Sequence, residues 1–451
     1  MHSAANLDQT DGEHLIPLDR TGAPPRRERL MTLEANRRTK LPRRFVVFLT
    51  LTVVSVAGGM GPYLAYAVLA TNSASTPEDA GRVTSWVFAI YLVGLSFATP
   101  YGPWAAQKLG AIRLAAASFF GEVLLSLATT ALLFAEAPLV PMLLAVSLTS
   151  GLLVGSRQST VPLVQEAYSG GGDIESASAQ SRRARGVAYA IGALGAGVLL
   201  AQVGPEAVFL IAAVLGLPLV IFLLRCPPKT AVKVASMAKP WRSMLYEIRT
   251  RQNLRWAVWL GVAAALLMSP MVDMIVPVLN KLGHSEGEKA GLLLMFFALG
   301  EIVTPNVVNR LGKGRHSFVA GVRAVQLTGV AILIMAVAVR LPYGPDLVLL
   351  SIGAMLFGAI FYSLASFLYE TSTHNVPEGE QNEVLSAFML AIGIAAPIGT
   401  LLWGHLLDSV ATEVFFVAIA AVVILILPAL MLRPMRTMET AAKDAPQLDE
   451  I

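Results

Sequence analysis

Five ionisable side chains lie inside long apolar runs of this sequence: Glu122, Arg157, Asp273, Glu301 and Arg323. A charged group inside an apolar helix is costly to place in a bilayer, so such residues are functional candidates by default. A carboxyl group there can take up and release a proton when its access to water changes sides. An arginine stays charged, and it can bind an anion or pair with a carboxylate.

The runs that hold these residues are long enough to cross a membrane. Of the 451 residues, 55% are hydrophobic and 14% are charged, whereas a soluble domain carries roughly 25% charged residues. Runs of about 20 apolar residues, each able to cross the hydrocarbon core as a helix, recur along most of the chain. The composition predicts an all-α integral membrane protein within the lipid bilayer, and it disfavours nucleic-acid binding despite the net charge of +4.

Twelve spans are predicted, and the loops between them fix an orientation. Basic residues crowd the region before Phe45, which places the amino terminus in the cytosol by the positive-inside rule. Twelve crossings return the carboxyl terminus to the cytosol, as expected for a multi-pass protein of the cytoplasmic (inner) membrane. The predicted spans are 45–70, 82–106, 112–135, 139–165, 184–203, 206–225, 254–280, 288–309, 317–340, 346–369, 383–407 and 412–433.

A short polar stretch occurs twice in the chain, between the second and third spans and between the eighth and ninth. Its two glycines, Gly110 and Gly312, are 202 residues apart (312 − 110 = 202). A second repeated pair, Glu166 and Glu370, has nearly the same offset (370 − 166 = 204). Two matching offsets predict a chain built from two similar halves. The two copies contain, in order, Gln107, Lys108, Gly110 and Arg113, then Asn309, Arg310, Gly312 and Arg315.

The repeat and the polar segments predict the domain organisation. The longest hydrophilic interior segment lies between the sixth and seventh spans and joins the two halves. Within it, Trp241, Leu245 and Ile248 recur at helical spacing, which is typical of either a short helix on the membrane surface or a solvated connector. The predicted parts are a disordered cytosolic tail (1–44), a first six-helix bundle (45–225), a cytosolic linker (226–253), a second six-helix bundle (254–433) and a cytosolic tail (434–451).

With these features the sequence resembles the major facilitator superfamily of transporters over about residues 45–433. The loop of that family after its second helix reads Gly-x-x-x-Asp-Arg-x-Gly-Arg-Arg. Gln107, Lys108 and Gly110 match its Asp, Arg and Gly positions, and Asn309, Arg310 and Gly312 match them in the second copy. Both copies lack the carboxylate. The resemblance implies two pseudo-symmetric six-helix bundles, alternating access around a central cavity and a conformational role for both loops. Alternatively, the loop cations only obey the positive-inside rule.

The resemblance also sorts the intramembrane residues. It implies that spans three, six, nine and twelve are peripheral, so Glu122 and Arg323 are more often structural. Glu301, and after it Asp273, are then the candidates for proton coupling, and Arg157 is a candidate to bind an anionic substrate group or pair with a carboxylate. Polar and aromatic side chains on the inner spans, each of which can equally be packing, complete the predicted lining: Gln158, Tyr63, Tyr66, Tyr91, Tyr362 and Trp403.

These features lead to one main functional hypothesis and two alternatives. The main one is a monomeric secondary transporter that exports a small organic molecule, such as a drug, antibiotic, siderophore or metabolite, against proton entry. The first alternative is an importer or uniporter of a polar or anionic nutrient, and the second is a membrane sensor or scaffold that does not transport. The sequence holds no enzyme motif, phosphate-binding loop or metal-ligand pattern, so neither enzyme activity, a metal nor a cofactor beyond the proton gradient is expected.

Overall fold

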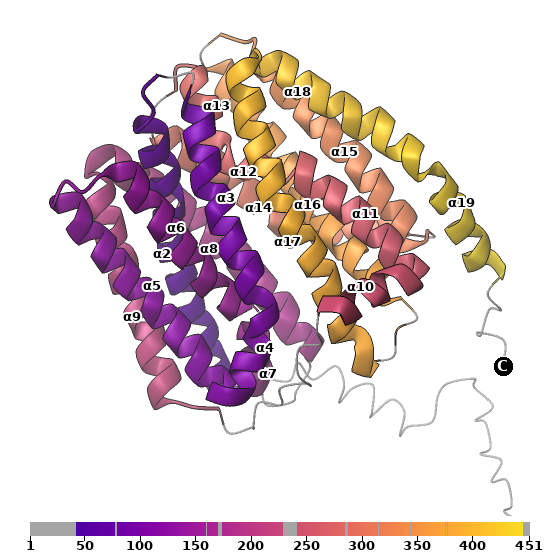
Figure 1. Ribbon diagram of the computed structural model, residues 1–451, viewed down its shortest axis with the longest axis horizontal. Helices are drawn as coiled ribbons and strands as arrows, with labels where there is room; N and C mark the ends of the chain where they lie inside the picture. The colour runs from indigo at the N-terminus through magenta and orange to yellow at the C-terminus, as the bar shows by residue number, and fades with distance from the viewer. Residues whose placement is uncertain are drawn as a thin grey trace, which may run out of the picture. The chain divides into compact units, whose positions relative to one another are not determined.

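The computed structural model describes residues 42–444 except 77–78, 159, 170–173, 229–240, 285–286, 314, 343, 375 and 377. These residues form helices joined by short connections, and no strand occurs among them. Twelve of the helical segments are long and apolar enough to cross a membrane. The prediction of an all-α fold with twelve spans is therefore confirmed (Figure 1). Of the predicted tails 1–44 and 434–451, residues 1–41 and 445–451 lie outside the described residues, whereas α2 already begins at Arg43 and α19 continues to Asp444.

The first half of the chain contributes six spans, each close to its predicted range. Helix α4 (Gly102–Leu109) connects the second span to the third. The spans consist of α2 (Arg43–Asn72), α3 (Ala80–Ala98) with the 3-10 turn η2 (Thr99–Tyr101), α5 (Ala111–Phe134), α6 (Leu139–Gln158) with α7 (Val161–Ser169), α8 (Ile174–Gln202) and α9 (Pro205–Arg225).

The second half follows the linker helix α10 (Trp241–Thr250), so of the two alternatives for Trp241, Leu245 and Ile248 the helix is seen, while its place on the membrane surface stays a prediction. Its Ile248 packs against α17, so α10 lies on the second half. The six spans consist of α11 (Gln252–Leu267) with α12 (Pro270–Asp273), then α14 (Gly287–Gly312), α15 (Ser317–Ala338), α16 (Pro345–Thr373), α17 (Glu378–Ser409), and α18 (Thr412–Ala421) with the π-helical turn η3 (Val422–Ile426) and α19 (Leu427–Asp444); α13 (Ile275–Lys281) follows α12.

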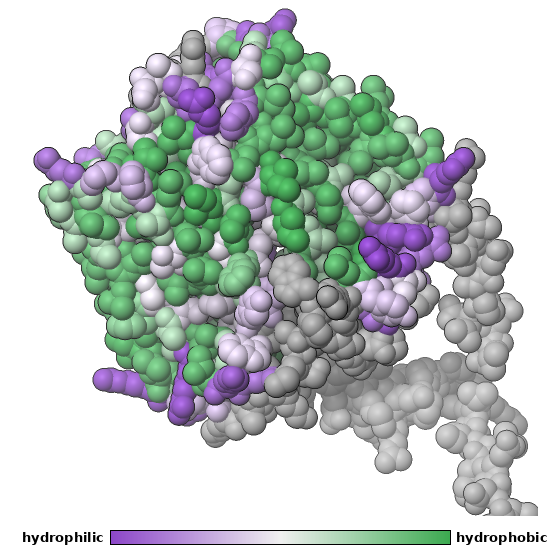
Figure 2. All heavy atoms as spheres, in the orientation of Figure 1, coloured by the Kyte–Doolittle hydropathy of each residue, from purple (hydrophilic) through white to green (hydrophobic). Residues whose placement is uncertain are grey.

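Because successive spans alternate in direction, the connections gather at two ends of the bundle. We call the end that holds the start of α2 and helix α10 the linker end, and the end that holds the α2–α3 connection and α13 the far end (Figure 1). Between them, large apolar side chains are exposed on the outer surface, for example Phe97 at 58% and Val348 at 63%. Figure 2 shows this apolar surface with hydrophilic residues toward the ends. A surface of this kind fits a hydrocarbon environment.

The helix of the seventh span is interrupted at Pro270, close to the intramembrane carboxyl group of Asp273. Pro270 lacks an N–H group, and α11 ends at Leu267 before α12 starts at Pro270. Asp273 is the last residue of this short helix. In contrast, Pro62 and Pro397 lie inside the continuous helices α2 and α17. The helix is therefore interrupted in the seventh span but not in the first or eleventh.

The same close helix crossing occurs in both halves. A Cβ on Gly151 in α6 would collide with the carbonyl oxygen of Tyr91 in α3, and a Cβ on Gly358 in α16 would collide with that of Phe297 in α14. The two glycines are 207 residues apart (358 − 151 = 207). This offset exceeds the 202 of the loop repeat because Gly358 follows Gly312 by 46 residues (358 − 312 = 46), whereas Gly151 follows Gly110 by 41 (151 − 110 = 41).

The two halves meet along two pairs of helices, α8 with α14 and α3 with α17. The second pair lies side by side in the foreground of Figure 1. Ser96 Oγ donates to the Gly393 carbonyl oxygen across that pair at 2.7 Å. Toward the far end, α13 also contacts α2 and α3. These contacts surround a cavity between the halves.

Candidate functional site

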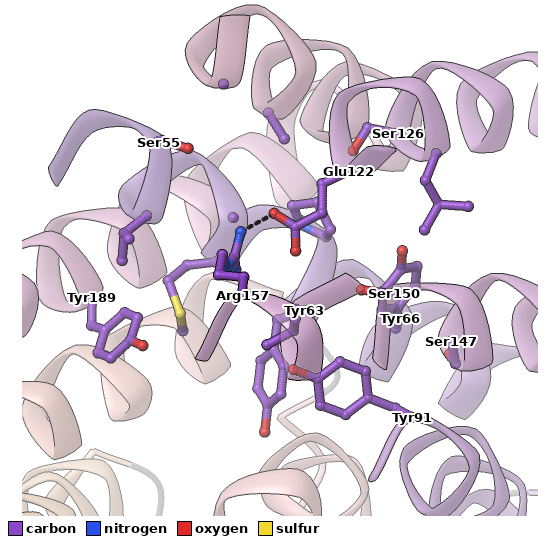
Figure 3. Close-up of a pocket in the computed structure, with 18 of the residues that line it drawn as sticks. Ser55, Tyr63, Tyr66, Tyr91, Glu122, Ser126, Ser147, Ser150, Arg157 and Tyr189 are labelled. Carbon is purple, nitrogen blue, oxygen red and sulfur yellow. Dashed lines mark hydrogen bonds and ion pairs between the residues drawn. The ribbon is translucent and has the colours of Figure 1, made fainter. Parts of the chain in front are cut away.

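A cavity of about 290 Å³ lies among helices of both halves. The first half lines it with residues of α2, α3, α5, α6, α8 and α9, and the second half with residues of α12, α14 and α16. Figure 3 shows that hydroxyl groups and one ion pair reach into it from several helices. Its volume is near the lower end of the range for small-molecule sites, which are mostly apolar with a few placed polar groups.

An ion pair between Glu122 and Arg157 is the charged centre of the cavity. An Arg157 Nη1–H group donates to Glu122 Oε2, and the guanidinium also stacks over the Phe119 ring at 4.6 Å from its centroid. About a fifth to a quarter of each side chain is exposed, 21% for Arg157 and 25% for Glu122. The pair neutralises both charges inside an apolar bundle, which reduces the cost of placing either one there.

Glu122 lies in this lining although it belongs to α5, the third span. The expectation that the third span is peripheral is therefore wrong at Glu122, and a structural role of this residue stays a prediction. The α9 residues Ala212 and Gly216 of the sixth span also line the cavity. Arg323, in contrast, is exposed on α15 and is not among the described lining residues.

Most of the predicted lining residues lie where they were expected. Trp403 of α17 is the exception among them. It is fully buried against α18, where its ring centroid lies 4.7 Å from that of Phe415, and it does not reach the cavity. Tyr189 in α8 lines the cavity and was not predicted; its sequence signal, a tyrosine within an apolar run of an inner span, was the same as that of the others. The predicted residues found in the lining are Arg157, Gln158, Tyr63, Tyr66, Tyr91 and Tyr362.

Asp273 connects the cavity wall to both halves. Its Oδ1 accepts a hydrogen bond from Tyr63 Oη of α2 at 2.6 Å, and its Oδ2 accepts one from Thr400 Oγ1 of α17 at 3.2 Å. The residue is 7% exposed. No cation pairs with it within the described part of the chain. It is thus a buried carboxyl group held only by two hydroxyl groups.

Glu301 has a different environment, because it pairs with a cation of the other half. Its Oε1 lies 2.7 Å from Arg185 Nη2 of α8. The Glu301 side chain is 6% exposed and that of Arg185 is 47% exposed. The second oxygen, Oε2, is buried and accepts no hydrogen bond from the described residues. Glu301 is outside the described lining of the cavity.

The two repeated loops lie at the linker end. In the first copy, Gln107 and Lys108 are in α4, Lys108 lies over the Trp104 ring at 4.4 Å, and Gly110 has a φ of 86° that favours glycine. In the second copy, Asn309, Arg310 and Gly312 end α14, and Arg315 Nη1 donates to the Leu311 carbonyl oxygen at 2.9 Å. Arg113 is exposed in the first turn of α5. Their conformational role stays a prediction.

Metal binding finds no support in the described residues, among which no group of three or more His, Cys, Asp or Glu side chains could hold an ion. Free Cys226 is half-buried at the end of α9. The described residues therefore form a cavity between two helical halves, with a neutralised ion pair and several hydroxyl groups inside it and carboxyl groups beside it.

Three solved structures with the same fold are membrane transporters. A D-xylose-proton symporter aligns with a TM-score of 0.63 at 13% identity, covering 85% of this chain and 97% of its own. The nucleoside transporter NupG aligns at 0.60 and 12% identity, covering 86% and 98%. The human organic anion transporter MFSD10 (TETRAN) aligns at 0.59 and 15% identity, covering 85% and 98%. At these identities the likeness concerns the fold alone.

Comparison with curated protein sequences gives no match. The family model of the Major Facilitator Superfamily, however, matches residues 45–375. This range includes the first half, the linker and most of the second half, with the cavity and both repeated loops. The chain therefore belongs to the major facilitator superfamily of membrane transporters.

Proposed function

We propose that this protein is a secondary active transporter that exports a small organic molecule through the central cavity in exchange for protons. The observation that carries the proposal is the cavity between the halves, which combines the Glu122–Arg157 pair with several tyrosine hydroxyl groups. A site between two pseudo-symmetric bundles can be reached from either side when the bundles rock against each other. We also propose that both termini are cytosolic, that the halves span 45–225 and 254–433, and that the monomer is the active unit.

Asp273 is better suited than Glu301 to carry the coupling proton. A carboxyl group without a cationic partner is costly to keep charged in an apolar interior, so neutralisation by a proton is favourable. Asp273 has only hydroxyl partners, whereas Glu301 is paired with Arg185. Because Tyr63 both lines the cavity and donates to Asp273, a substrate that moves Tyr63 would change the environment of this carboxyl group. This reverses the order in which the two carboxyl groups were predicted.

The direction of transport separates the proposal from its main alternative. Export is suggested by Gly192, Gly195 and Gly197 of the fifth span, which are loosely similar to the glycine- and proline-rich fifth helix of exporters in the family, although Ala196 stands where their proline would be. Import with protons is the second candidate, and the similarity to a D-xylose-proton symporter favours it. An anionic substrate held by Arg157 alone is less favoured, because that guanidinium is already paired with Glu122.

Proton movement in energised inside-out vesicles tests the coupling and the direction together. A pH-sensitive dye reports collapse of the proton gradient when a compound from a metabolite and drug library enters in exchange for protons. An exporter gives this signal with at least one compound, and Asp273→Asn abolishes it. If no compound collapses the gradient in vesicles but one makes the medium outside intact cells more alkaline, protons enter the cell together with that compound and the protein is a symporter. Absence of proton movement in both preparations, with transport still measured by mass spectrometry, contradicts proton coupling.

A matched pair of glycine variants shows whether the cavity is the transport route. Gly59 lines the cavity, and a Cβ placed there meets no atom within 4 Å. Leucine at this position should fill the cavity without disturbing helix packing, so Gly59→Leu should remove transport while the protein still folds. Gly195 also has open space around it but is outside the described lining, and Gly195→Leu should keep transport. Equal activity of the two variants would show that the substrate takes another route.

A further inference from the structure

One side of the cavity is a recess formed only by the first half. Five residues make it: Tyr66 of α2, Glu122 and Ser126 of α5, and Ser147 and Ser150 of α6. We call it the hydroxyl recess. In Figure 3 the four hydroxyl-bearing residues lie on one side of the Glu122–Arg157 pair, and Tyr189 lies on the other. The recess therefore concentrates groups that both donate and accept hydrogen bonds beside a carboxylate that only accepts them.

Ser147 is the residue that points to a ligand. Its hydroxyl group is fully buried, and no described residue forms a hydrogen bond with it. Serine and threonine in apolar helices commonly donate to the carbonyl oxygen one turn earlier, and Ser118, Thr129 and Thr130 of the neighbouring α5 do so. A buried hydroxyl group without a partner lowers stability and calls for an explanation. Because Ser147 lies in the cavity lining, a polar group of a bound molecule is an explanation that its position supports.

The charge of the lining restricts what that molecule can be. Glu122 and Arg157 are the charged residues among the described lining residues, and they neutralise each other. A charged substrate would have to separate this pair or lie beside it without a partner, and both are unfavourable in a low-dielectric site. An uncharged group can instead bond to the recess while the pair stays formed.

Aromatic rings stand among the aliphatic side chains of the remaining wall. Phe119 lies under Arg157, and Phe297 and Tyr362 form a ring pair with centroids 5.5 Å apart. Ring faces of this kind pack against a flat or cyclic part of a ligand. The cavity thus offers one aromatic side and one side with hydroxyl groups.

We propose that the hydroxyl recess binds the hydroxyl groups of an uncharged substrate that also has a ring, as in glycosides and nucleosides. Hydroxyl groups of the substrate accept from or donate to Ser147, Ser126 and Ser150 and donate to Glu122, and the ring packs on the aromatic side. This inference rests on the cavity being the transport site proposed above. It adds the substrate class, and it assigns recognition of the hydroxyl groups to the first half.

Binding to the purified full-length protein in nanodiscs tests the inference without a transport assay. The uncharged probes are phenyl β-D-glucopyranoside and uridine. Phenyl β-D-glucuronide and uridine 5′-monophosphate carry a negative charge, and the tetra-O-methyl ether of the glucoside and 2′,3′,5′-trideoxyuridine lack the hydroxyl groups. A ligand that binds the folded state raises the unfolding temperature, and at a fixed concentration a tighter ligand raises it more. We expect a shift with at least one uncharged hydroxylated probe and a much smaller shift with its anionic and hydroxyl-free counterparts.

Two serine variants show whether the recess is responsible. Ser147→Ala should weaken binding of the active probe by about fivefold to tenfold, as for loss of one hydrogen bond. It should also raise the unfolding temperature of the ligand-free protein, because an unpartnered buried hydroxyl group is removed. Ser363→Ala is the control, since Ser363 is equally buried but donates to the Ala359 carbonyl oxygen and is outside the described lining. It should leave probe affinity unchanged.

The outcomes separate this inference from the proposed function. Three results overturn the substrate class and leave a recess filled by water only. The anionic or hydroxyl-free probes stabilise the protein as well as the hydroxylated ones do, no hydroxylated probe stabilises it, or the active probe stabilises Ser147→Ala as much as the original protein. Vesicle transport of other compounds would then still support the proposed function. Conversely, Ser147-dependent binding without proton movement in vesicles would retain the recess and reject proton-coupled transport.

Discussion

The Asp408 carboxylate in α17 accepts the backbone N–H of Arg82 at the start of α3, with 2.7 Å between Arg82 N and Asp408 Oδ2. Its Oδ1 accepts the N–H of Gly81 at 3.1 Å. Asp79, the residue at the N-cap position of α3, forms no such bond. A helix of the first half thus receives its N-terminal cap from a helix of the second half. Because the first N–H groups of a helix need acceptors, this contact favours a closed far end.

Asp408→Ala should therefore open the far end more often. Loss of an N-cap costs about 1 kcal/mol, which corresponds to roughly a fivefold increase in the open population. A thiol introduced by Gly59→Cys in a Cys226→Ser background reports access to the cavity, and membrane-impermeant maleimide is added to right-side-out and inside-out vesicles. Labelling from the far side should rise about fivefold.

Asp408→Asn is the control for this prediction. The asparagine oxygen can still cap α3, but the charge that faces Lys281 at 3.8 Å is lost. Labelling should rise less than in Asp408→Ala. Equal labelling in the original protein and both variants would mean that the cap does not hold the far end closed.

The Arg185–Glu301 pair should couple the halves energetically. Arg185→Gln leaves the buried Glu301 carboxylate without its cation, so the free energy of unfolding should fall by about 2 kcal/mol. This is less than the cost of breaking a fully buried pair, because nearly half of the Arg185 side chain is exposed. A double-mutant cycle with Glu301→Gln, measured by thermal unfolding in detergent, gives the coupling energy. Additive effects of the two single variants would show that the pair contributes nothing.

The close helix crossings should not tolerate a methyl group. Gly151→Ala should push α6 away from α3, and Gly358→Ala should push α16 away from α14, because each new Cβ meets a backbone carbonyl oxygen. Overpacking of this kind costs about 1–3 kcal/mol, so the unfolding temperature should fall in both variants. Gly195→Ala, where a Cβ meets no atom within 4 Å, should raise it slightly, because alanine is the better helix former. Similar falls in all three would contradict the crossing argument.

His316 should make stability depend on pH at the linker end. Burial, and then the neighbouring His374, lower the pKa of His316, and its neutral Nδ1 accepts the N–H of Phe318 at 3.2 Å to cap α15. The unfolded chain therefore binds the proton more readily than the folded one. The stability that neutral His316 contributes is complete above the unfolded pKa of about 6.5, and it is lost as the pH falls toward the lower pKa of the folded state.

The prediction is tested by comparing unfolding temperatures at pH 7.5 and 5.5. His316→Asn keeps a capping side chain that does not titrate in this range, so the drop between the two pH values should be smaller than in the original protein. His405→Asn, which changes an exposed histidine bonded to its own helix, should leave the drop unchanged. An undiminished drop in His316→Asn would assign the pH dependence to other groups.

The sequence by itself determined the membrane spans of this protein. Twelve apolar runs gave twelve helices within a few residues, because a helix that crosses a bilayer must satisfy its own backbone and needs a fixed apolar length. The sequence also identified the ionisable residues inside those runs. Local spacing offered a helix in the linker as one of two alternatives, and Trp241–Thr250 is helical.

Only the tertiary structure decided which of these residues meet. Glu122 and Arg157 are 35 residues apart, Arg185 and Glu301 are 116 apart, and Tyr63 and Asp273 are 210 apart. A membrane helix is apolar on the lipid side and on much of the packed side, so its sequence does not mark the face that turns toward a cavity. For the same reason Trp403 was expected in the lining but packs between helices, whereas Glu122 on a helix thought peripheral lies beside Arg157.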